Sequence, residues 1–149
     1  MVIFSAFDIS ASGLTAQRYR MDIISENVAN ANTTRTEDGS PYRRKVVTFS
    51  EKGGQTSFSK VLGEAAYNRG YTGQGVKVSG VYQDYATEMN QVYDPSHPDA
   101  DENGYVTYPN VNIVTEMTNM IDASRAYEAN ATAFNASKSM ALQGLEMRS

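Results

Sequence analysis

The sequence contains no cysteine, no tryptophan and a single histidine. Without cysteine, the chain can form no disulfide, no thiolate zinc site and no cysteine nucleophile. A catalytic or metal site built on several imidazoles is excluded in the same way. We therefore expect no metal and no cofactor, and we assign no catalytic residue.

Positive charge and long apolar runs are also scarce. The 17 Asp and Glu outnumber the 13 Lys and Arg, which gives a net charge of −4 and argues against a protein that mainly binds nucleic-acid phosphates. No segment approaches the roughly 18 apolar residues of a membrane span. Residues 1–14 carry no basic residue and contain Asp8, unlike a cleaved secretory signal. We expect neither nucleic-acid binding nor membrane insertion.

Both ends of the chain carry the apolar periodicity of helices, and we predict helical segments over residues 1–34 and 109–149. One face of the first segment carries Leu14, Met21, Ile24, Val28 and Ala31. Steps of four and three make a heptad seam along the second segment. This seam consists of Ile113, Met117, Met120, Ser124, Tyr127, Ala131, Phe134, Lys138, Ala141 and Leu145.

The middle of the chain, residues 35–108, is richer in glycine, proline and strand-forming residues. Strand patterns occur at 42–49, 75–85 and 105–108. Residues 58–67 are ambiguous between a short helix and a loop. The sequence therefore predicts an α+β fold in which a small antiparallel β unit is inserted between two terminal helices.

A helix with a one-sided apolar stripe must bury it, so the two ends are each other's natural partners. We predict that they pair as a coiled coil. Such a pair still leaves apolar surface in water, because Phe4, Phe7, Val114, Ile121 and Leu142 lie off the main seam. We expect neighbouring subunits to cover those faces. The alternative is an intramolecular hairpin packed on its own β core.

Residues 99–104, DADENG, match the opening of an EF-hand calcium loop. The loop needs a bidentate Glu at its twelfth position, which is Asn110, and prolines stand where the flanking helices belong. We expect a turn with a positive φ at Gly104 in place of a calcium site. The single histidine, His97, is expected to make a hydrogen bond within its loop.

Two polar clusters admit two interpretations each. The basic run Arg43-Arg44-Lys45 is typical of a solvated strand edge, or it contacts the acidic 99–102 loop of a neighbouring subunit. The Asn-rich residues 27–32 terminate a helix through their side-chain amides, or they fix the register of an adjacent subunit.

Several motifs together resemble a known family. Residues 25–33, SENVANANT, resemble the N-terminal signature of the bacterial flagellar axial proteins, which are the rod, hook and hook-associated proteins. Residues 116–121 and 125–130, EMTNMI and RAYEAN, resemble the C-terminal signature. Residues 93–101 and 104–106, with the short length, resemble the proximal-rod members. The signature residues are Asn27, Asn30, Asn32, Asp94, Pro95, His97, Pro98, Asp99, Asp101, Gly104 and Arg125.

The resemblance implies terminal helices that line the core of a hollow tube, with the β-rich middle facing outward. It implies self-association and, as partners, other rod proteins and the export and adaptor components of the basal body. It implies a place in the periplasmic rod, reached by flagellar type III export without a cleaved signal. The implied role is mechanical, namely to transmit torque, and not enzymatic.

Three alternatives stay open: another short axial protein, a generic coiled-coil adaptor, and a carboxylate-based hydrolase using Asp94, Asp99 or Asp101. The hydrolase lacks a second acid that the sequence places opposite the first. Behaviour in isolation separates these classes. A rod subunit should be a monomer whose termini become ordered on assembly. An adaptor should form a defined oligomer alone, and an enzyme should contain a rigid pocket with convergent polar groups.

Overall fold

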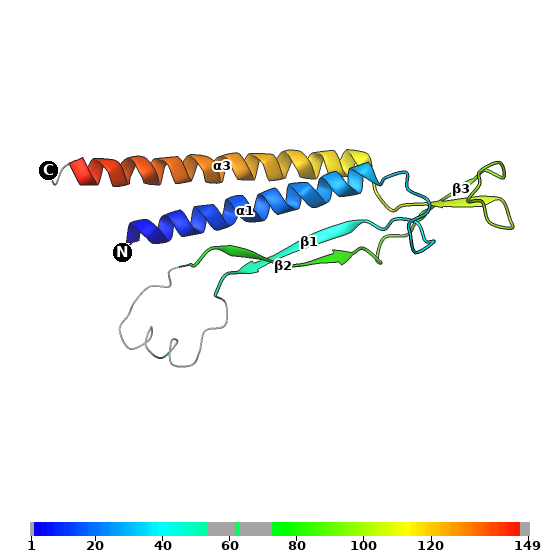
Figure 1. The fold of residues 1–149 in the computed structure, drawn as a ribbon, viewed down its shortest axis with the longest axis horizontal. Coiled ribbons are helices and arrows are strands. Elements are labelled where there is room, and N and C mark those ends of the chain that lie inside the picture. Colours follow the sequence, from blue (N-terminus) through cyan, green and yellow to red (C-terminus); the bar gives the residue numbers. More distant parts are fainter. Residues whose placement is uncertain (1, 54–61, 63–72, 147–149) are drawn as a thin grey trace. The chain divides into compact units, whose positions relative to one another are not determined.

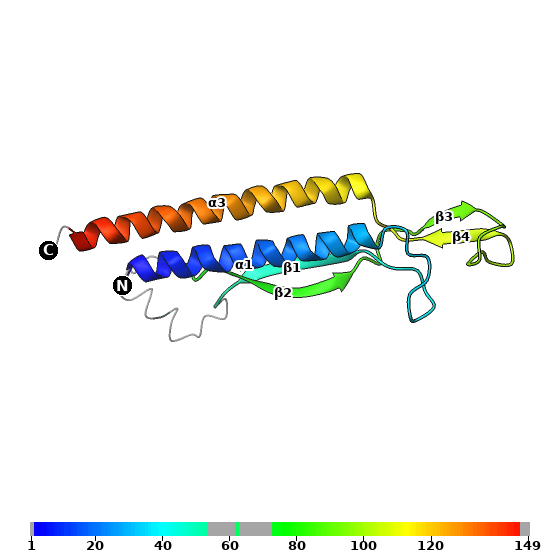
Figure 2. The same cartoon turned by 45° about the horizontal axis from the view of Figure 1, so that its top comes forward.

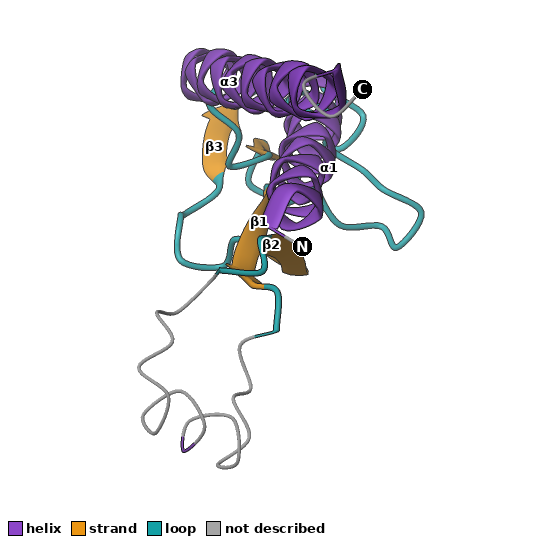
Figure 3. Cartoon of the chain, turned by 90° about the vertical axis from the view of Figure 1, so that its left-hand side faces the viewer, coloured by secondary structure: helices purple, strands orange, loops and turns teal. Residues whose placement is uncertain are grey.

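The computed structural model describes residues 2–53, 62 and 73–146 (Figure 1). In chain order its helices and strands are α1 (Val2–Ala29), β1 (Lys45–Glu51), β2 (Val76–Gln83), β3 (Asn90–Tyr93), β4 (Tyr105–Tyr108) and α3 (Ile113–Glu146). Figure 3 shows the helices in purple and the strands in orange. Two long terminal helices in contact with a small antiparallel β region confirm the predicted α+β class.

Helix α1 contains no proline, and it ends where an asparagine side chain begins to hydrogen-bond the backbone. The backbone N–H of Asn30 donates to the carbonyl of Glu26 over 3.1 Å, and Asn30 Nδ2 donates to the same oxygen over 2.9 Å. Thr33 Oγ1 in turn donates to Asn30 Oδ1. These bonds satisfy groups that a helix end leaves unpaired, so the amide of Asn30 stops the helix before residue 34.

Helix α3 begins at a polar cap. The Oδ1 atom of Asn112 accepts a hydrogen bond from the backbone N–H of Thr115 over 3.2 Å, and the carbonyl of Asn112 accepts from Glu116 N over 2.9 Å. Because asparagine is a preferred N-cap, the helix starts at Ile113. Glu116 then lies in the first turn, where a negative charge is favoured.

In the described part of the chain, the strands form two two-stranded sheets. Strand β1 pairs with β2, and β3 pairs with β4 in antiparallel register from Asn90↔Tyr108 to Tyr93↔Tyr105 (Figure 2). Strands β1, β2 and β4 lie where the sequence predicts them. Strand β3 was missed because it begins with two polar residues and all four of its residues are exposed. Apart from residue 62, the ambiguous segment 58–67 lies outside the described residues.

The chain divides into two compact units, and α1, α3, β1 and β2 contribute residues to both. Unit 1 comprises residues 1–18, 49–79 and 125–149, and unit 2 comprises residues 19–48 and 80–124. In unit 1, Ala16 is a buried apolar residue. In unit 2, the same is true of Ile24, Ala31, Tyr42, Val106 and Ala123. The described core is small, as the modest hydrophobic content predicts.

Candidate subunit-assembly site

In unit 1, α1 and α3 are antiparallel and approach each other closely. The rings of Phe7 and Phe134 meet edge to face, with centroids 5.0 Å apart. Gly13 lies against Asn130, and a Cβ at Gly13 would lie 2.6 Å from the Asn130 Oδ1 atom. A larger residue at position 13 would therefore displace the Asn130 side chain. Phe7, expected to face a neighbouring subunit, contacts its own α3.

A single serine attaches the start of β2 to α1 in the same unit. Ser12 Oγ accepts a hydrogen bond from the backbone N–H of Val76 over 3.0 Å and donates one to the carbonyl of Ile9 over 2.7 Å. The adjacent Gly75 has φ +96°, and a Cβ there would collide with Ser12 Oγ. The contact therefore needs a residue without a side chain at position 75.

In unit 2, α1 and α3 meet through polar side chains. Asn27 and Glu116 are each 1% exposed, and Asn27 Nδ2 donates to Glu116 Oε2 over 3.0 Å and to the carbonyl of Lys45 over 2.8 Å. Asn27 Oδ1 accepts from Lys45 N and from the hydroxyl of Tyr42, both over 2.9 Å. One buried amide thus joins both helices to strand β1.

The buried Glu116 carboxylate is neutralised by Arg44. Arg44 Nε and Nη2 lie 2.9 and 2.8 Å from Glu116 Oε1, and Arg44 Nη1 lies 3.5 Å from Asp84 Oδ2. Arg44 N donates to Asn110 Oδ1 over 2.9 Å, and Asn110 Nδ2 donates to the carbonyls of Asp84 and Thr87. Because a buried charge is costly unless paired and hydrogen-bonded, this network holds β1, β2 and the entry to α3 together.

The electrostatics of the network favour its present protonation states. Burial, with the nearby charges of Glu26 and Glu116, raises the pKa of Tyr42 to about 12. Hydrogen bonds from Thr87 are the main cause that lowers the pKa of the Asp84 carboxyl. Tyr42 therefore stays a neutral donor and Asp84 an ionised acceptor at neutral pH. The polar groups of this network are engaged with one another, which is the arrangement of a structural cluster.

The residues predicted to pack between helices and subunits differ in how far they are buried within one chain. Ile24 and Ala31 are buried, whereas Leu14, Met21, Val28, Met120, Ala131 and Phe134 are half-buried. Four others on α3 are exposed, namely Ile113, Met117, Tyr127 and Leu145. The inner face of α3 instead includes Glu116 and Ala123, which are buried, and Asn130, which contacts Gly13. The exposed members of the seam are therefore available to another subunit.

An exposed apolar stripe runs along the start of α3 in unit 2. Val114, Met117 and Ile121 are 74%, 58% and 52% exposed. Their spacing of three and four residues places them on one helix face. In unit 1, Met140, Leu142 and Leu145 are also more than half exposed. Contiguous apolar surface of this kind is typical of interaction sites.

The acidic mid-chain loop is organised by its own side chains. Asp94 Oδ1 accepts from the Ser96 N–H and hydroxyl, which lowers the pKa of Asp94. Asp101 Oδ1 accepts from Asn103 N and Tyr105 N. Gly104 has φ +81°, which confirms the predicted turn. These bonds hold the loop in turns stabilised by aspartate side chains.

The remaining signature residues have structural environments in the loop and on the helices. His97 Nδ1 accepts from Asp99 N over 3.1 Å, which confirms its loop hydrogen bond. Asp99 also accepts from Thr34 Oγ1 over 2.8 Å. Of five further signature residues, Asn30 at the end of α1 is half-buried, and four are exposed, namely Asn32, Pro95, Pro98 and Arg125. The described residues contain no cluster of three metal-binding side chains.

Comparisons with known proteins agree with this architecture. Residues 7–35 match the family model "Flagella basal body rod protein", and residues 102–147 match "Flagellar basal body rod FlgEFG protein C-terminal". These two ranges contain most of α1 and of α3. The described part of the chain has no helix that is long and apolar enough to cross a bilayer.

Whole-chain relatives are also similar. The flagellar basal-body rod protein FlgC of Bacillus subtilis is 46% identical, with 99% of each chain covered. The proteins of the same name from Borreliella burgdorferi and Salmonella typhimurium are 46% and 42% identical, over 94% and 99% of this chain. The predicted family resemblance is confirmed, and because this family is structural, so is the expectation that the chain is not an enzyme. The chain belongs to the FlgC family of flagellar basal-body rod proteins.

Proposed function

We propose that this structural rod subunit joins copies of itself and other rod proteins in the proximal rod, forming a hollow helical tube. The tube transmits motor torque and conducts exported proteins. We also propose that the chain is exported by the flagellar type III apparatus and contacts the export and adaptor components of the basal body. Assembly with other rod proteins follows from family membership; the tube, the route and the neighbours are our proposal.

The apolar stripe of Val114, Met117 and Ile121 supports this proposal most directly. A stripe more than half exposed over two helical turns loses favourable burial in water, and packing against another subunit restores it. The stripe lies on one face of α3 and can pack against a different surface of the next subunit. Head-to-tail contacts of this kind build open helical assemblies when they repeat without closing.

The stiff elements needed to carry torque are also present. Helix α3 has 34 residues and α1 has 28, and polar bonds as well as apolar contacts join them. Because a packed helix pair resists bending better than a loop-rich domain, the terminal helices are suited to line the tube and bear load.

Complementation tests the proposal in the bacterium that encodes the chain. Deleting its gene should abolish swimming, and re-expression should restore swimming and return the chain to isolated basal bodies. If the cells swim without the chain, or if basal bodies lack it, the proposal is wrong. Sedimentation of the purified chain separates the adaptor alternative, because an adaptor would form a defined oligomer alone.

A further inference from the structure

Among the described residues, one cation of the basic run at the start of β1 has no acidic partner. Arg44 is paired with Glu116, and Lys45 with Glu26. Within the described part of the chain, Arg43 makes no ion pair. A half-buried guanidinium without a carboxylate is an unused site for negative charge.

Arg43 is held in place by its neighbours. Arg43 Nη1 donates to the carbonyl of Asp84 over 3.3 Å, and its guanidinium carbon lies 4.4 Å from the centre of the Tyr85 ring. The Tyr85 hydroxyl in turn donates to Gln83 Oε1 over 2.6 Å. Stacking and hydrogen bonding reduce the entropy that Arg43 loses when it binds an anion.

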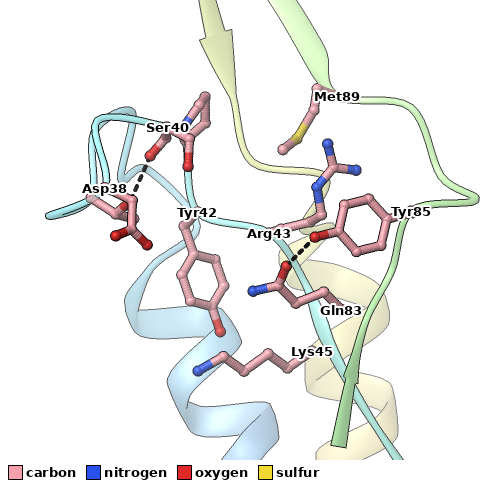
Figure 4. Close-up of a pocket in the computed structure, with 10 residues that line it drawn as sticks. Asp38, Ser40, Tyr42, Arg43, Lys45, Gln83, Tyr85 and Met89 are labelled. Carbon is pink, nitrogen blue, oxygen red and sulfur yellow. Dashed lines mark hydrogen bonds between the residues drawn. The ribbon is translucent and has the colours of Figure 1, made fainter.

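These side chains line a pocket of about 390 Å³ (Figure 4). Tyr42, Tyr85 and Met89 supply apolar walls around Arg43, and Lys45 lies at one side. Asp38 is the acidic residue of the lining, on the loop across from Tyr85. The pocket therefore suits a short acidic segment of a protein whose carboxylate reaches Arg43.

The same unit carries an acidic loop with unpaired charge. Asp99 is engaged by Arg35, 3.8 Å away. Asp101 and Glu102 are exposed, and in the described residues neither makes an ion pair. The loop tip therefore presents two negative charges to solvent.

The loop and the pocket are two different features of unit 2. Pro41 lines the Arg43 pocket and also a second hollow of about 340 Å³, which Asp99 and Asp101 line. The segment around Pro41 thus separates the two sites. A contact between two different parts of the surface is heterologous, and its repetition builds an open filament when the rotation between copies does not close.

We propose that the Asp101–Glu102 loop of one copy docks into the Arg43 pocket of the next copy. This inference deepens the proposed function, because it names one contact between adjacent copies in the rod. Arg43 pairs with the carboxylate of Glu102, and the Tyr85 side of the pocket covers the loop.

Cross-linking tests the contact, because the chain has no cysteine of its own. Ser40→Cys and Asn103→Cys chains are expressed together in cells that build the rod, and isolated basal bodies are oxidised mildly, so that only two different copies can form the mixed disulfide. We expect this heterodimer to exceed either homodimer. A Glu88→Cys chain replaces Asn103→Cys as the control and should give only background. Background yield from the 40 and 103 pair overturns the inference.

Exchanging the charges of Arg43 and Glu102 in the same cysteine variants tests the ion pair. Arg43→Glu or Glu102→Lys alone should lower the heterodimer yield about tenfold, and combining them should restore it. Arg43→Gln guards against misfolding and should also lower the yield, whereas Lys77→Glu and Glu88→Lys should not. If the double exchange restores nothing, the contact is wrong. If the chain restores swimming but its cysteine variants do not cross-link, this inference alone is wrong. If the variants cross-link but cells swim without the chain, the proposed function alone is wrong.

Discussion

Asn27 Nδ2 donates a hydrogen bond to Glu116 Oε2 over 3.0 Å, across 89 positions of sequence. Both side chains are 1% exposed. The bond joins the end of α1 to the first turn of α3 with directional groups in place of apolar contact. Polar groups buried between helices penalise a shifted alignment, because a shift leaves them unpaired. In this unit, hydrogen bonds fix the alignment of α1 with α3, which apolar contacts alone would define less well.

Removing the cation of this cluster should be strongly destabilising. Arg44→Met leaves the Glu116 carboxylate buried without its partner, and we expect a loss of about 3–5 kcal/mol of unfolding free energy. The matched change at exposed Arg125, Arg125→Met, should cost less than about 0.5 kcal/mol. Urea denaturation followed by circular dichroism measures both.

The double variant Arg44→Met with Glu116→Leu separates pairing from packing. It removes both charges, so most of the lost stability should return. If the double variant is as unstable as Arg44→Met alone, the Arg44–Glu116 pair is not the cause.

The sequence predicts the helices and most strands well, because these depend on local periodicity. Met21, Ile24 and Val28 repeat at helical spacing, and all three lie on α1 as expected. The polar cluster could not be predicted in the same way. Arg44 and Glu116 are 72 positions apart, and no spacing rule links a residue just before a strand to a residue in a distant helix. Only the fold brings them together.

Heptad spacing likewise does not reveal that Glu116 and Asn130 lie on the inner face of α3. Apolar residues were assigned to the seam because burial of apolar surface normally dominates. Here the neighbouring apolar Met117 is exposed and the charged Glu116 is buried. The signal available was an acidic residue in a first helical turn together with a basic run elsewhere, which is too common to identify a partner.

Tyr42 predicts a specific response to alkaline pH. Its pKa is about 12 in the folded chain, above the ordinary value of 10.0. A raised pKa means that its stabilising contribution is complete below pH 10 and is lost as the pH rises towards 12. Tyrosinate absorbance should show a late titration phase near pH 12 that belongs to Tyr42.

Tyr42→Phe is the matched control for this titration. The late phase should disappear, and stability should fall less steeply between pH 10 and 12 than in the unsubstituted chain. A late phase that survives Tyr42→Phe would assign the shifted pKa to another tyrosine.

Two glycines with positive φ should differ in their tolerance of alanine. Gly39 has φ +78° and open space around it, whereas Gly75 has φ +96° and Ser12 Oγ in the position of a Cβ. Gly39→Ala should cost about 1–2 kcal/mol from backbone strain alone. Gly75→Ala should cost more, because it also displaces Ser12 from β2.

Thermal unfolding compares the two glycine variants directly. The melting temperature of Gly75→Ala should lie below that of Gly39→Ala by several degrees. Ser12→Ala combined with Gly75→Ala should recover part of this difference. Equal melting temperatures for the two glycine variants would exclude the close contact.

The apolar stripe of α3 should matter for assembly and not for folding. Ile121 is 52% exposed, so Ile121→Asp should change the unfolding free energy by less than about 0.5 kcal/mol. In cells it should abolish swimming, because a charge buried at a subunit contact is costly. Asp122→Asn, at the adjacent exposed position, should leave swimming intact. Normal motility of Ile121→Asp would show that this face has no partner.

The central claim is that α3 completes its burial only among other subunits, and amide hydrogen exchange tests it most directly. Exchange over residues 113–146 is measured for the full free chain and for the chain in isolated rods. The account predicts that these amides exchange at least about tenfold more slowly in rods. Equal protection of residues 113–146 in the free chain and in the rod would contradict it.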